Sequence, residues 1–389
     1  MSQKEILLYD ERSRGFAALV KYGTHLFLSG SDGYRDPESE ELDLRLVHKP
    51  IEQCHNAFRR IQCRLERAGY SGECVIRILH FTSGQEWSLQ RMATWPDHFG
   101  EVGHSQAVAW GTQAKMADFN AITAFAWALT PELKRQVILP QPKRGRSARL
   151  TRAGDFLYAF GVGGSSNPYT GEEVAFNAPN AFERQHFNNF EVLRSFLEKV
   201  PASLEDFIRL DAGFRRNVED ARAYRACTKK LFGGKIPFAH FALPLGELAN
   251  RLMQLGGIAV APGVQKKIRW SVEDPGVAET VKAGELVFVS SLAGNRDPES
   301  GGIIRDLCAD KRAQARQVLR YLKAALERAG TTLDRMLSLE VYIRDIYFED
   351  EFVRIAMEVF GDNPPVICVA GAELEEGIEV QVVGVAGAS

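Results

Sequence analysis

The sequence is informative first through what it lacks. Its 389 residues include six cysteines, but there is no C-x-x-C pair and no zinc-ligand spacing, so neither a disulfide framework nor a metal site is predicted. It contains no apolar run of about 18 residues, the length a transmembrane helix needs. The start MSQKEILLYD lacks the basic-then-apolar pattern of a secretory signal. We therefore expect a cytoplasmic protein without a membrane anchor, a metal or a cofactor.

An excess of charge of one sign is also missing. The formal net charge of −2 gives no general attraction to nucleic acid or to membrane surfaces. The one basic cluster, at residues 143–146, has no interleaved aromatic residues and is interpreted as a solvated linker. The sequence also has no P-loop and no G-x-S-x-G motif, so it gives no sign of those nucleotide-binding or serine-hydrolase sites. A small molecule is the expected partner.

What the sequence does contain is an internal repeat. The pentapeptide LERAG occurs at residues 65–69 and 326–330, and RDPES occurs at residues 35–39 and 296–300. Both pairs are 261 residues apart, and the same offset holds without gaps over about 80 residues. Self-similarity at a fixed spacing indicates copies of one structural unit.

A middle copy is expected at about half that spacing. The segment RAGDFLYAFG around Gly154 corresponds to KYGTHLFLSG around Gly23 and to KAGELVFVSS around Gly284. The chain is thus predicted to consist of three repeats: 1–130, 131–262 and 263–389. The joins TPELKRQ and APGVQKK carry proline, glycine and charge, as is typical of domain boundaries.

The third repeat shows its elements most clearly. A strand at 286–290, a turn at RDPESGG and a helix at 311–328 are followed by a strand at 337–343 and by a second helix ending at Phe360-Gly361. Two strands close the repeat, at 366–370 and 378–385. The first helix of each repeat carries an apolar stripe: Ala315, Val318, Leu319, Leu322, Ala325 and Leu326; Cys54, Phe58, Ile61 and Leu65; Phe187, Phe190, Leu193 and Leu197.

The order β-β-α-β-α-β-β predicts an α+β layer with two helices on one face of a mixed sheet. In the strand at 337–343, the apolar residues Leu337, Leu339, Val341 and Ile343 alternate with Ser338, Glu340 and Tyr342. The helices can cover only one face. Because the other face also carries apolar residues, such as Leu79 and Phe81, we expect the other two repeats to cover it.

These motifs together resemble the Rid family, also called YjgF proteins or L-PSP endoribonucleases. The resemblance rests on K-x-G-x-L-V-F-V-S, D-P-x-S-G, L-x-x-A-G-x-x-L-D, F-G-D-N-P-P and I-E-V, in that order. It covers all of repeat three and most of repeat one, and repeat two more loosely. It implies chorismate-mutase-like domains and sites in the clefts between subunits of a trimer. Three tandem copies then imply a monomer that forms an intramolecular pseudo-threefold trimer, with further dimerisation left open.

The resemblance also implies candidate catalytic groups. The water-orienting carboxylate of the family corresponds to Glu379 in repeat three and to Asp118 in repeat one, while repeat two has no acid there. The alternative is that both acids are solvated sheet residues. The arginine that binds the substrate carboxylate in the family is absent from all three repeats, which argues for an unusual substrate.

Other side chains near the implied clefts remain open between a functional and a structural role. His104 and His240 lie within a residue or two of the missing arginine and could act as a base or a donor. The candidate substrate-binding residues are Ser29, Arg35, Ser290, Arg296 and Cys368. Turn formation would equally explain the serines and arginines, and burial in a strand would explain the cysteine.

Three functions follow in order of preference. The first is a Rid-like hydrolase or deaminase acting on an imine, enamine or amide-like C–N bond of a small metabolite at an inter-domain cleft. The second is a non-catalytic small-molecule-binding or scaffold protein, and the third is a nuclease. A cleft that brings together an acid, a histidine and a hydroxyl would favour the enzyme, whereas filled or apolar clefts would favour the scaffold.

Overall fold

The structure is a computed structural model of the chain. It describes residues 2–10, 15–82, 97–99, 105–111, 122–140, 148–214, 218–244 and 251–389, with only the backbone course for 105–111.

The described helices and strands fall into three segments. The first contains β1 (Lys4–Tyr9), β2 (Ala17–Tyr22), β3 (His25–Leu28), β4 (Ser31–Asp32), α1 (Pro50–Arg67), β5 (Val75–Thr82), β6 (Ser105–Gly111) and β7 (Ile122–Leu129). The second contains β8 (Arg135–Pro140), β9 (Ala148–Ala153), β10 (Phe156–Gly163), α3 (Ala181–Leu197), β11 (Phe207–Phe214), α4 (Val218–Leu231), β12 (Ala239–Pro244) and β13 (Met253–Val260). The third contains β14 (Lys266–Trp270), β15 (Ala278–Ala283), β16 (Leu286–Ala293), α5 (Lys311–Arg328), β17 (Met336–Ile343), α6 (Glu349–Phe360), β18 (Val366–Gly371) and β19 (Val380–Gly387). Short 3-10 turns lie at Leu44–Leu46, Gly72–Cys74, Leu204–Asp206, Arg305–Leu307, Leu333–Arg335 and Ile346–Phe348.

Helix α5 has the bounds that the sequence predicts. The Asp310 side chain caps it by accepting hydrogen bonds from the backbone N–H groups of Arg312 and Ala313. Gly330, with a φ of +79°, follows its C-terminal end. The predicted apolar stripe of α5 is fully buried against the sheet.

Strand pairing has the same order in each segment. In the third, β15 pairs with β16, β16 with β19, β19 with β17, and β17 in parallel with β18. The second runs β9-β10-β13-β11-β12 and the first β2-β3-β7-β5-β6 in the same way.

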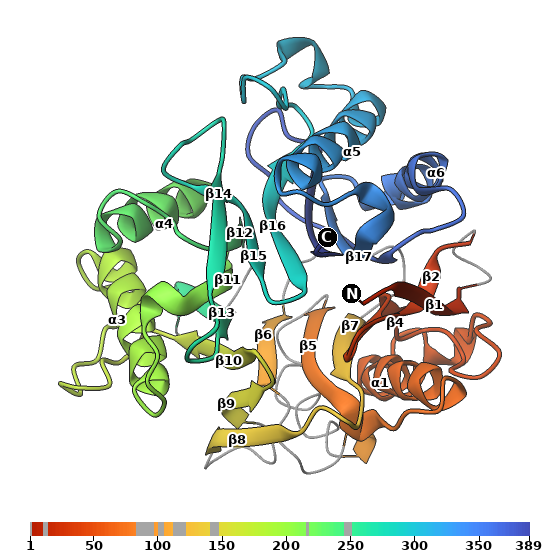
Figure 1. The fold of residues 1–389 in the computed structure, drawn as a ribbon, viewed down its shortest axis with the longest axis horizontal. Helices are drawn as coiled ribbons and strands as arrows, with labels where there is room; N and C mark the ends of the chain where they lie inside the picture. Colours follow the sequence, from red (N-terminus) through yellow and green to blue (C-terminus); the bar gives the residue numbers. More distant parts are fainter. Residues whose placement is uncertain are drawn as a thin grey trace.

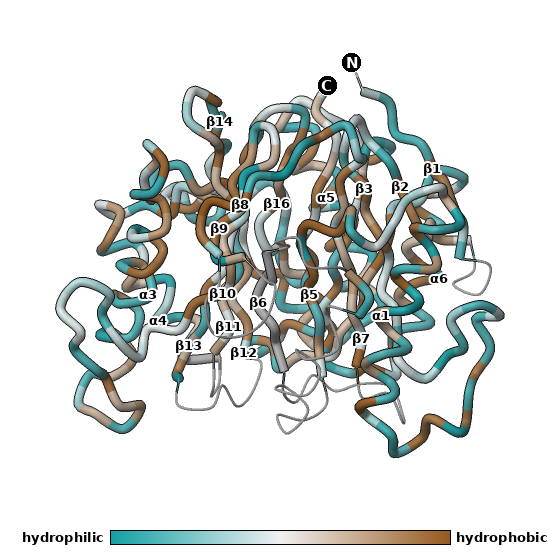
Figure 2. The backbone as a smooth tube through the Cα atoms, turned by 90° about the horizontal axis from the view of Figure 1, so that it is seen from below, coloured by the Kyte–Doolittle hydropathy of each residue, from teal (hydrophilic) through white to brown (hydrophobic). Residues whose placement is uncertain are grey.

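Parallel bridges join neighbouring segments into one ring. They connect β6 to β9, Ile236 to Val277, and β18 to β2. Because the last bridge returns from the third segment to the first, the sheet closes on itself. Figure 1 shows the strands around the centre with the helices outside them. In the perpendicular view of Figure 2, the strands run side by side through the middle, with α3 and α4 on one side of them and α1 and α6 on the other.

The hydrophobic core is divided in a way that follows from this ring. Three clusters lie between the helices and the sheet of one segment each. A fourth lies inside the ring and takes residues from all three segments. In it the Phe288 ring contacts Trp127 and Phe156 at centroid distances of 6.3 and 6.1 Å, and Tyr342 contacts Phe241 at 5.5 Å. The sheet faces that the helices leave bare therefore bury one another.

Two details of the sequence prediction are wrong. Leu337 lies in the central cluster rather than with Leu339 and Val341, because the pairing of β17 with β19 shifts register between Met336 and Ser338. Phe187 on α3 is 49% exposed. The inward position is taken by Gln185, which binds Val174 O and Leu252 N, and residues two apart point to different sides of a helix.

A buried ion cluster links the three segments inside the ring. Arg209 on β11 donates to both carboxylate oxygens of Glu340 on β17, each at 2.7 Å, and to Asp211 Oδ1 at 2.7 Å. Arg77 on β5 pairs with the other oxygen of Asp211 and lies over the Trp127 ring at 4.7 Å. All four charged side chains are 3% exposed or less. Burial, and then the neighbouring Arg209, lowers the pKa of Arg77 to about 9, which keeps it charged at neutral pH.

We predict that Glu340→Gln lowers the free energy of unfolding by about 3–5 kcal/mol, because it leaves two buried arginines with one carboxylate. The control is Glu358→Gln, which removes an exposed ion pair with Arg354 and should cost less than about 1 kcal/mol. Urea unfolding measures both. Equal losses in the two variants would contradict a structural role for the cluster.

Candidate active site

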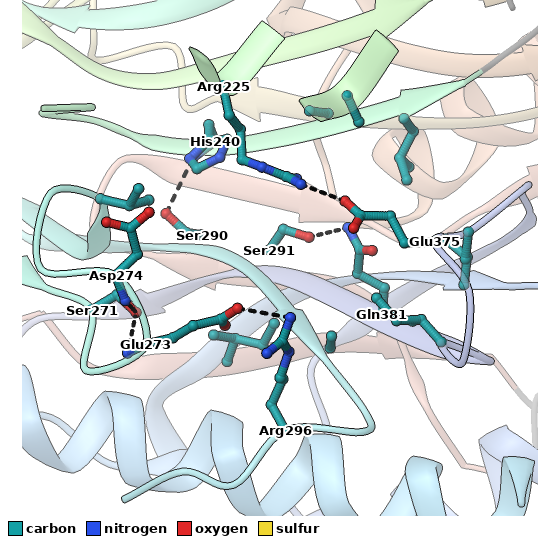
Figure 3. Close-up of a pocket in the computed structure, with 18 of the residues that line it drawn as sticks. Arg225, His240, Ser271, Glu273, Asp274, Ser290, Ser291, Arg296, Glu375 and Gln381 are labelled. Carbon is teal, nitrogen blue, oxygen red and sulfur yellow. Dashed lines mark hydrogen bonds and ion pairs between the residues drawn. The ribbon is translucent and has the colours of Figure 1, made fainter. Parts of the chain in front are cut away.

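A pocket of about 170 Å³ lies at the junction of the second and third segments. One wall comes from α4 and β12, and the other from β15, β16, β19 and the connections before β15 and before β19. The polar side chains that line it and are labelled in Figure 3 are Arg225, His240, Ser271, Glu273, Asp274, Ser290, Ser291, Arg296, Glu375 and Gln381.

His240 enters the pocket from β12. Its backbone N–H donates to Ser290 Oγ at 3.2 Å, and the Ser290 hydroxyl donates to Ala278 O at 2.5 Å, which ties the two segments together at the pocket. Burial, and secondly Arg225, lowers the pKa of His240 to about 3, so the imidazole is neutral at neutral pH. Its Nδ1 atom is buried and has no hydrogen-bond partner among the described residues. A bound molecule could supply that partner.

Among the acids of the pocket, Glu273 has the environment that most favours acid–base chemistry. The side chain is 39% exposed, and the partial desolvation of its carboxyl raises its pKa, with Asp274 and Glu375 adding to the effect, while Arg296 and Arg225 oppose it. Its carboxylate lies 2.9 Å from Arg296 Nη2. Ser271 Oγ accepts its backbone N–H at 3.1 Å and so holds the turn that directs it. A carboxyl with a raised pKa in a cleft is a typical general acid or base.

The connection before β19 forms the rim. Arg225 Nη2 on α4 reaches Glu375 Oε1 at 2.6 Å, across the segment junction. Arg344 holds the same connection from behind, donating to the carbonyl oxygens of Leu374, Glu375 and Ile378 at 2.8–2.9 Å. Arg344 in turn pairs with Glu379 at 3.1 Å.

The predicted site residues are thus divided. His240, Ser290 and Arg296 converge on the pocket. Glu379, in the connection before β19, does not line it; Gln381 on β19 does, and its amide donates to Ser291 Oγ. His104, Asp118 and the basic cluster at 143–146 lie outside the described residues.

Ser29, Arg35 and Cys368 lie away from this pocket, near the junction of the third and first segments. Ser29 Oγ accepts from Arg64 Nη1 at 2.9 Å, and Arg35 pairs with Asp32 at 3.2 Å. Cys368 packs in the central cluster, and burial raises the pKa of its thiol well above the usual value. A thiol in this environment stays protonated at neutral pH and is a poor nucleophile.

Charged side chains of α1 fill that junction. Arg60 pairs with Asp32 at 2.9 Å and with Glu40, and Arg64 pairs with Asp10 at 3.3 Å. Both arginines are 3% exposed. The residues 261 positions later are Tyr321, which lines the pocket, and Ala325. The two junctions are therefore built differently.

Sequence reasoning did not find Glu273, Arg225, Glu375 or Gln381. Glu273 precedes the first repeated motif of its segment, and Arg225 lies on a helix whose equivalents carry no motif. These four residues are identified as pocket residues only because the folded chain brings them together.

Comparisons with known proteins fit the third segment best. The family model described as Endoribonuclease L-PSP matches residues 275–388. A RutC family protein of Pyrococcus horikoshii is 28% identical over 110 residues, which cover 28% of this chain and 84% of the relative. Protein HMF1 of Saccharomyces cerevisiae is 26% identical over 110 residues, covering 28% of this chain and 81% of HMF1.

The third segment of the chain is therefore similar to the Rid family. This similarity supports a deaminase-like, hydrolase-like or small-molecule-binding role in general terms. Over a larger part of the chain, the fold is similar to the crystal structure of a chorismatase. The TM-score is 0.52 at 14% identity, with 81% of this chain and 93% of the chorismatase covered.

Two further observations apply to the part of the chain that the structure describes. No group of three or more His, Cys, Asp or Glu side chains there could hold a metal ion. None of the helices there is long and apolar enough to cross a membrane.

We predict that the His240 imidazole of this protein does not titrate between about pH 5 and 8. Its folded pKa of about 3 lies below the ordinary 6.5, so the unfolded chain takes up the proton first as the pH falls. The stability from this group is complete above pH 6.5 and is lost as the pH falls from 6.5 towards 3. Histidine-ring NMR, assigned with a His240→Gln variant, measures the pKa. A midpoint near 6.5 would contradict the buried, neutral ring.

Proposed function

We propose that the chain is a Rid-like hydrolase or deaminase that acts on a C–N bond of a small metabolite in the pocket between the second and third segments. The observation that carries the proposal is the meeting of Glu273, whose pKa is raised, with the neutral His240 and the hydroxyl of Ser291 in one pocket. This combination of an acid, a histidine and a hydroxyl is what an enzyme requires and a scaffold does not.

The chemistry follows from these groups. Glu273 takes a proton from a water molecule as its oxygen adds to the carbon of a C=N bond, and the proton then passes to the nitrogen. The hydroxyl of this adduct then gives its proton to the nitrogen as the C–N bond breaks, leaving a carbonyl compound and releasing ammonia or an amine. His240 and Gln381 hydrogen-bond the substrate and orient it, and Ser290 and Arg296 belong to the same binding surface.

The proposal includes the origin of the pocket. The three segments are tandem copies of one Rid domain, and together they form the equivalent of a trimer in a single cytoplasmic chain. The common strand order and the fold similarity to a chorismatase support this origin. In this account Ser29 and Arg35 serve the junction of the third and first segments.

A binding protein without chemistry is the second candidate. The observation that favours it is that Glu379, the acid to which the resemblance assigns the family carboxylate, does not line the pocket, whereas the amide of Gln381 does. The Arg344 clamp also keeps the pocket wall formed in the absence of a ligand. A preformed pocket serves binding as well as catalysis.

We predict that Glu273→Gln lowers kcat by about 10²–10⁴-fold, the usual contribution of a general acid or base. The measurement is ammonia release from a panel of small imines, enamines and amides that includes compounds with none, one and two carboxylates. The matched control is Glu376→Gln, an exposed acid on the rim connection, which should leave kcat unchanged. Full turnover by Glu273→Gln would remove Glu273 from the mechanism, and no ammonia release from any compound would favour the binding protein.

A further inference from the structure

We infer that the pocket takes a small metabolite with two carboxylates, one bound by Arg225 and one by Arg296, each replacing a glutamate of the protein. The inference rests on the proposed function in using the same pocket and, for its effect on the chemistry, in the role of Glu273 as the base. It names the substrate class and the two residues that select it.

The two arginines approach the pocket from opposite walls. Arg225 belongs to α4 of the second segment, and Arg296 lies just after β16 of the third. Figure 3 shows them on either side of a space bordered by His240, Ser291 and Gln381. A ligand between those residues would have a guanidinium group at each end.

The protein's own glutamates show what each arginine binds. Glu375 Oε1 lies 2.6 Å from Arg225 Nη2, and Glu273 Oε1 lies 2.9 Å from Arg296 Nη2. These two carboxylates of the pocket lining stand in for the two carboxylates of a ligand. Guanidinium groups match carboxylates in shape and charge, which makes the exchange chemically direct.

The exchange costs little because both ion pairs reach solvent. The side chains are 35% and 23% exposed in the Arg225–Glu375 pair, and 23% and 39% exposed in the Arg296–Glu273 pair. Ion pairs of this kind contribute little to stability. When two carboxylates belong to one ligand molecule, the translational and rotational entropy of binding is lost once for two such contacts.

The other acids around the pocket do not turn it into a site for cations. Asp274 is paired with Lys229, and Glu279 is held by Arg328 at 2.9 Å. Lys229 and Arg328 do not line the pocket and pair with these two acids from outside it. The charges of Asp274 and Glu279 are therefore already balanced. The remaining acid of the lining, Glu373, is exposed to solvent. The two exchangeable pairs are those of Arg225 and Arg296.

The exchange would also prepare the chemistry. In the resting protein Arg296 lowers the pKa of Glu273, against the effect of burial. A ligand carboxylate at Arg296 adds a negative charge beside Glu273 and frees it from its partner. Both changes raise the proton affinity of Glu273 at the moment when a substrate is bound, so the water-activating base becomes available only in the complex.

The test is calorimetric binding of three probes of equal chain length: glutarate, pentanoate and 1,5-diaminopentane. We expect glutarate to bind at least about tenfold more tightly than pentanoate, and the diamine not to bind. Arg225→Gln and Arg296→Gln should each weaken glutarate binding about tenfold or more and leave pentanoate bound through the remaining arginine. Glu375→Gln should strengthen glutarate binding, because it removes a competitor for Arg225.

The matched control is Arg222→Gln. Arg222 lies 3.8 Å from Glu375, is 65% exposed and does not line the pocket, so its loss should leave glutarate binding unchanged. Equal affinity for glutarate and pentanoate, preference for the diamine, weaker binding by Glu375→Gln, or no glutarate binding at millimolar concentration would each overturn the inference. Ammonia release from uncharged compounds in that case would leave the proposed hydrolase standing, whereas tight glutarate binding without any turnover would support the inference and refute the hydrolase.

Discussion

The buried charges inside the ring are the constraint on which the rest of the structure depends. The central strands of the three sheets contribute different side chains at matching places: Arg77, Arg209 and Ser338 at one level, and Leu79, Asp211 and Glu340 at the next. Two arginines and two carboxylates balance only in this combination. Three identical segments would bring like charges together without water, at a large cost in free energy. The segments must therefore carry different residues at these places, which is possible because they are parts of one chain and not three copies of the same chain.

The pocket follows from the same constraint. Packing of the inner faces sets β12 beside β15 and β16, and the hydrogen bond from His240 N–H to Ser290 Oγ fixes the contact. Once each junction is made by a different pair of segments, each can carry different residues. At the junction of the third and first segments, Arg60 and Arg64 bring their own acidic partners. At the junction of the second and third, the side chain of Tyr321 and the two exchangeable ion pairs leave a space that a ligand can enter.

The sequence predicted the parts of the fold that local patterns determine. The apolar stripe and the flanking residues gave the bounds of α5, and the constant offset between motifs gave the common order of elements. Pairing across the ring was harder to foresee. The alternation in β17 placed Glu340 away from the helices but could not show that Arg209 lies opposite it. At the site, the sequence predicts that Glu379 lines the cleft, but Gln381 lines it instead. A strand pattern does not state how far along the cleft a given side chain lies. Glu273 and Arg225 come from stretches without a motif, and only the folded chain brings them together.

The central claim is that Arg209 and Glu340 hold two segments together as a pair rather than as independent polar residues. A double-mutant cycle with Arg209→Met and Glu340→Leu, followed by urea unfolding, tests it most directly. The account predicts that the double variant is more stable than the sum of the single losses implies, by about 2 kcal/mol or more, because it leaves fewer unpaired charges in the core. Additive losses in the two single variants would contradict it.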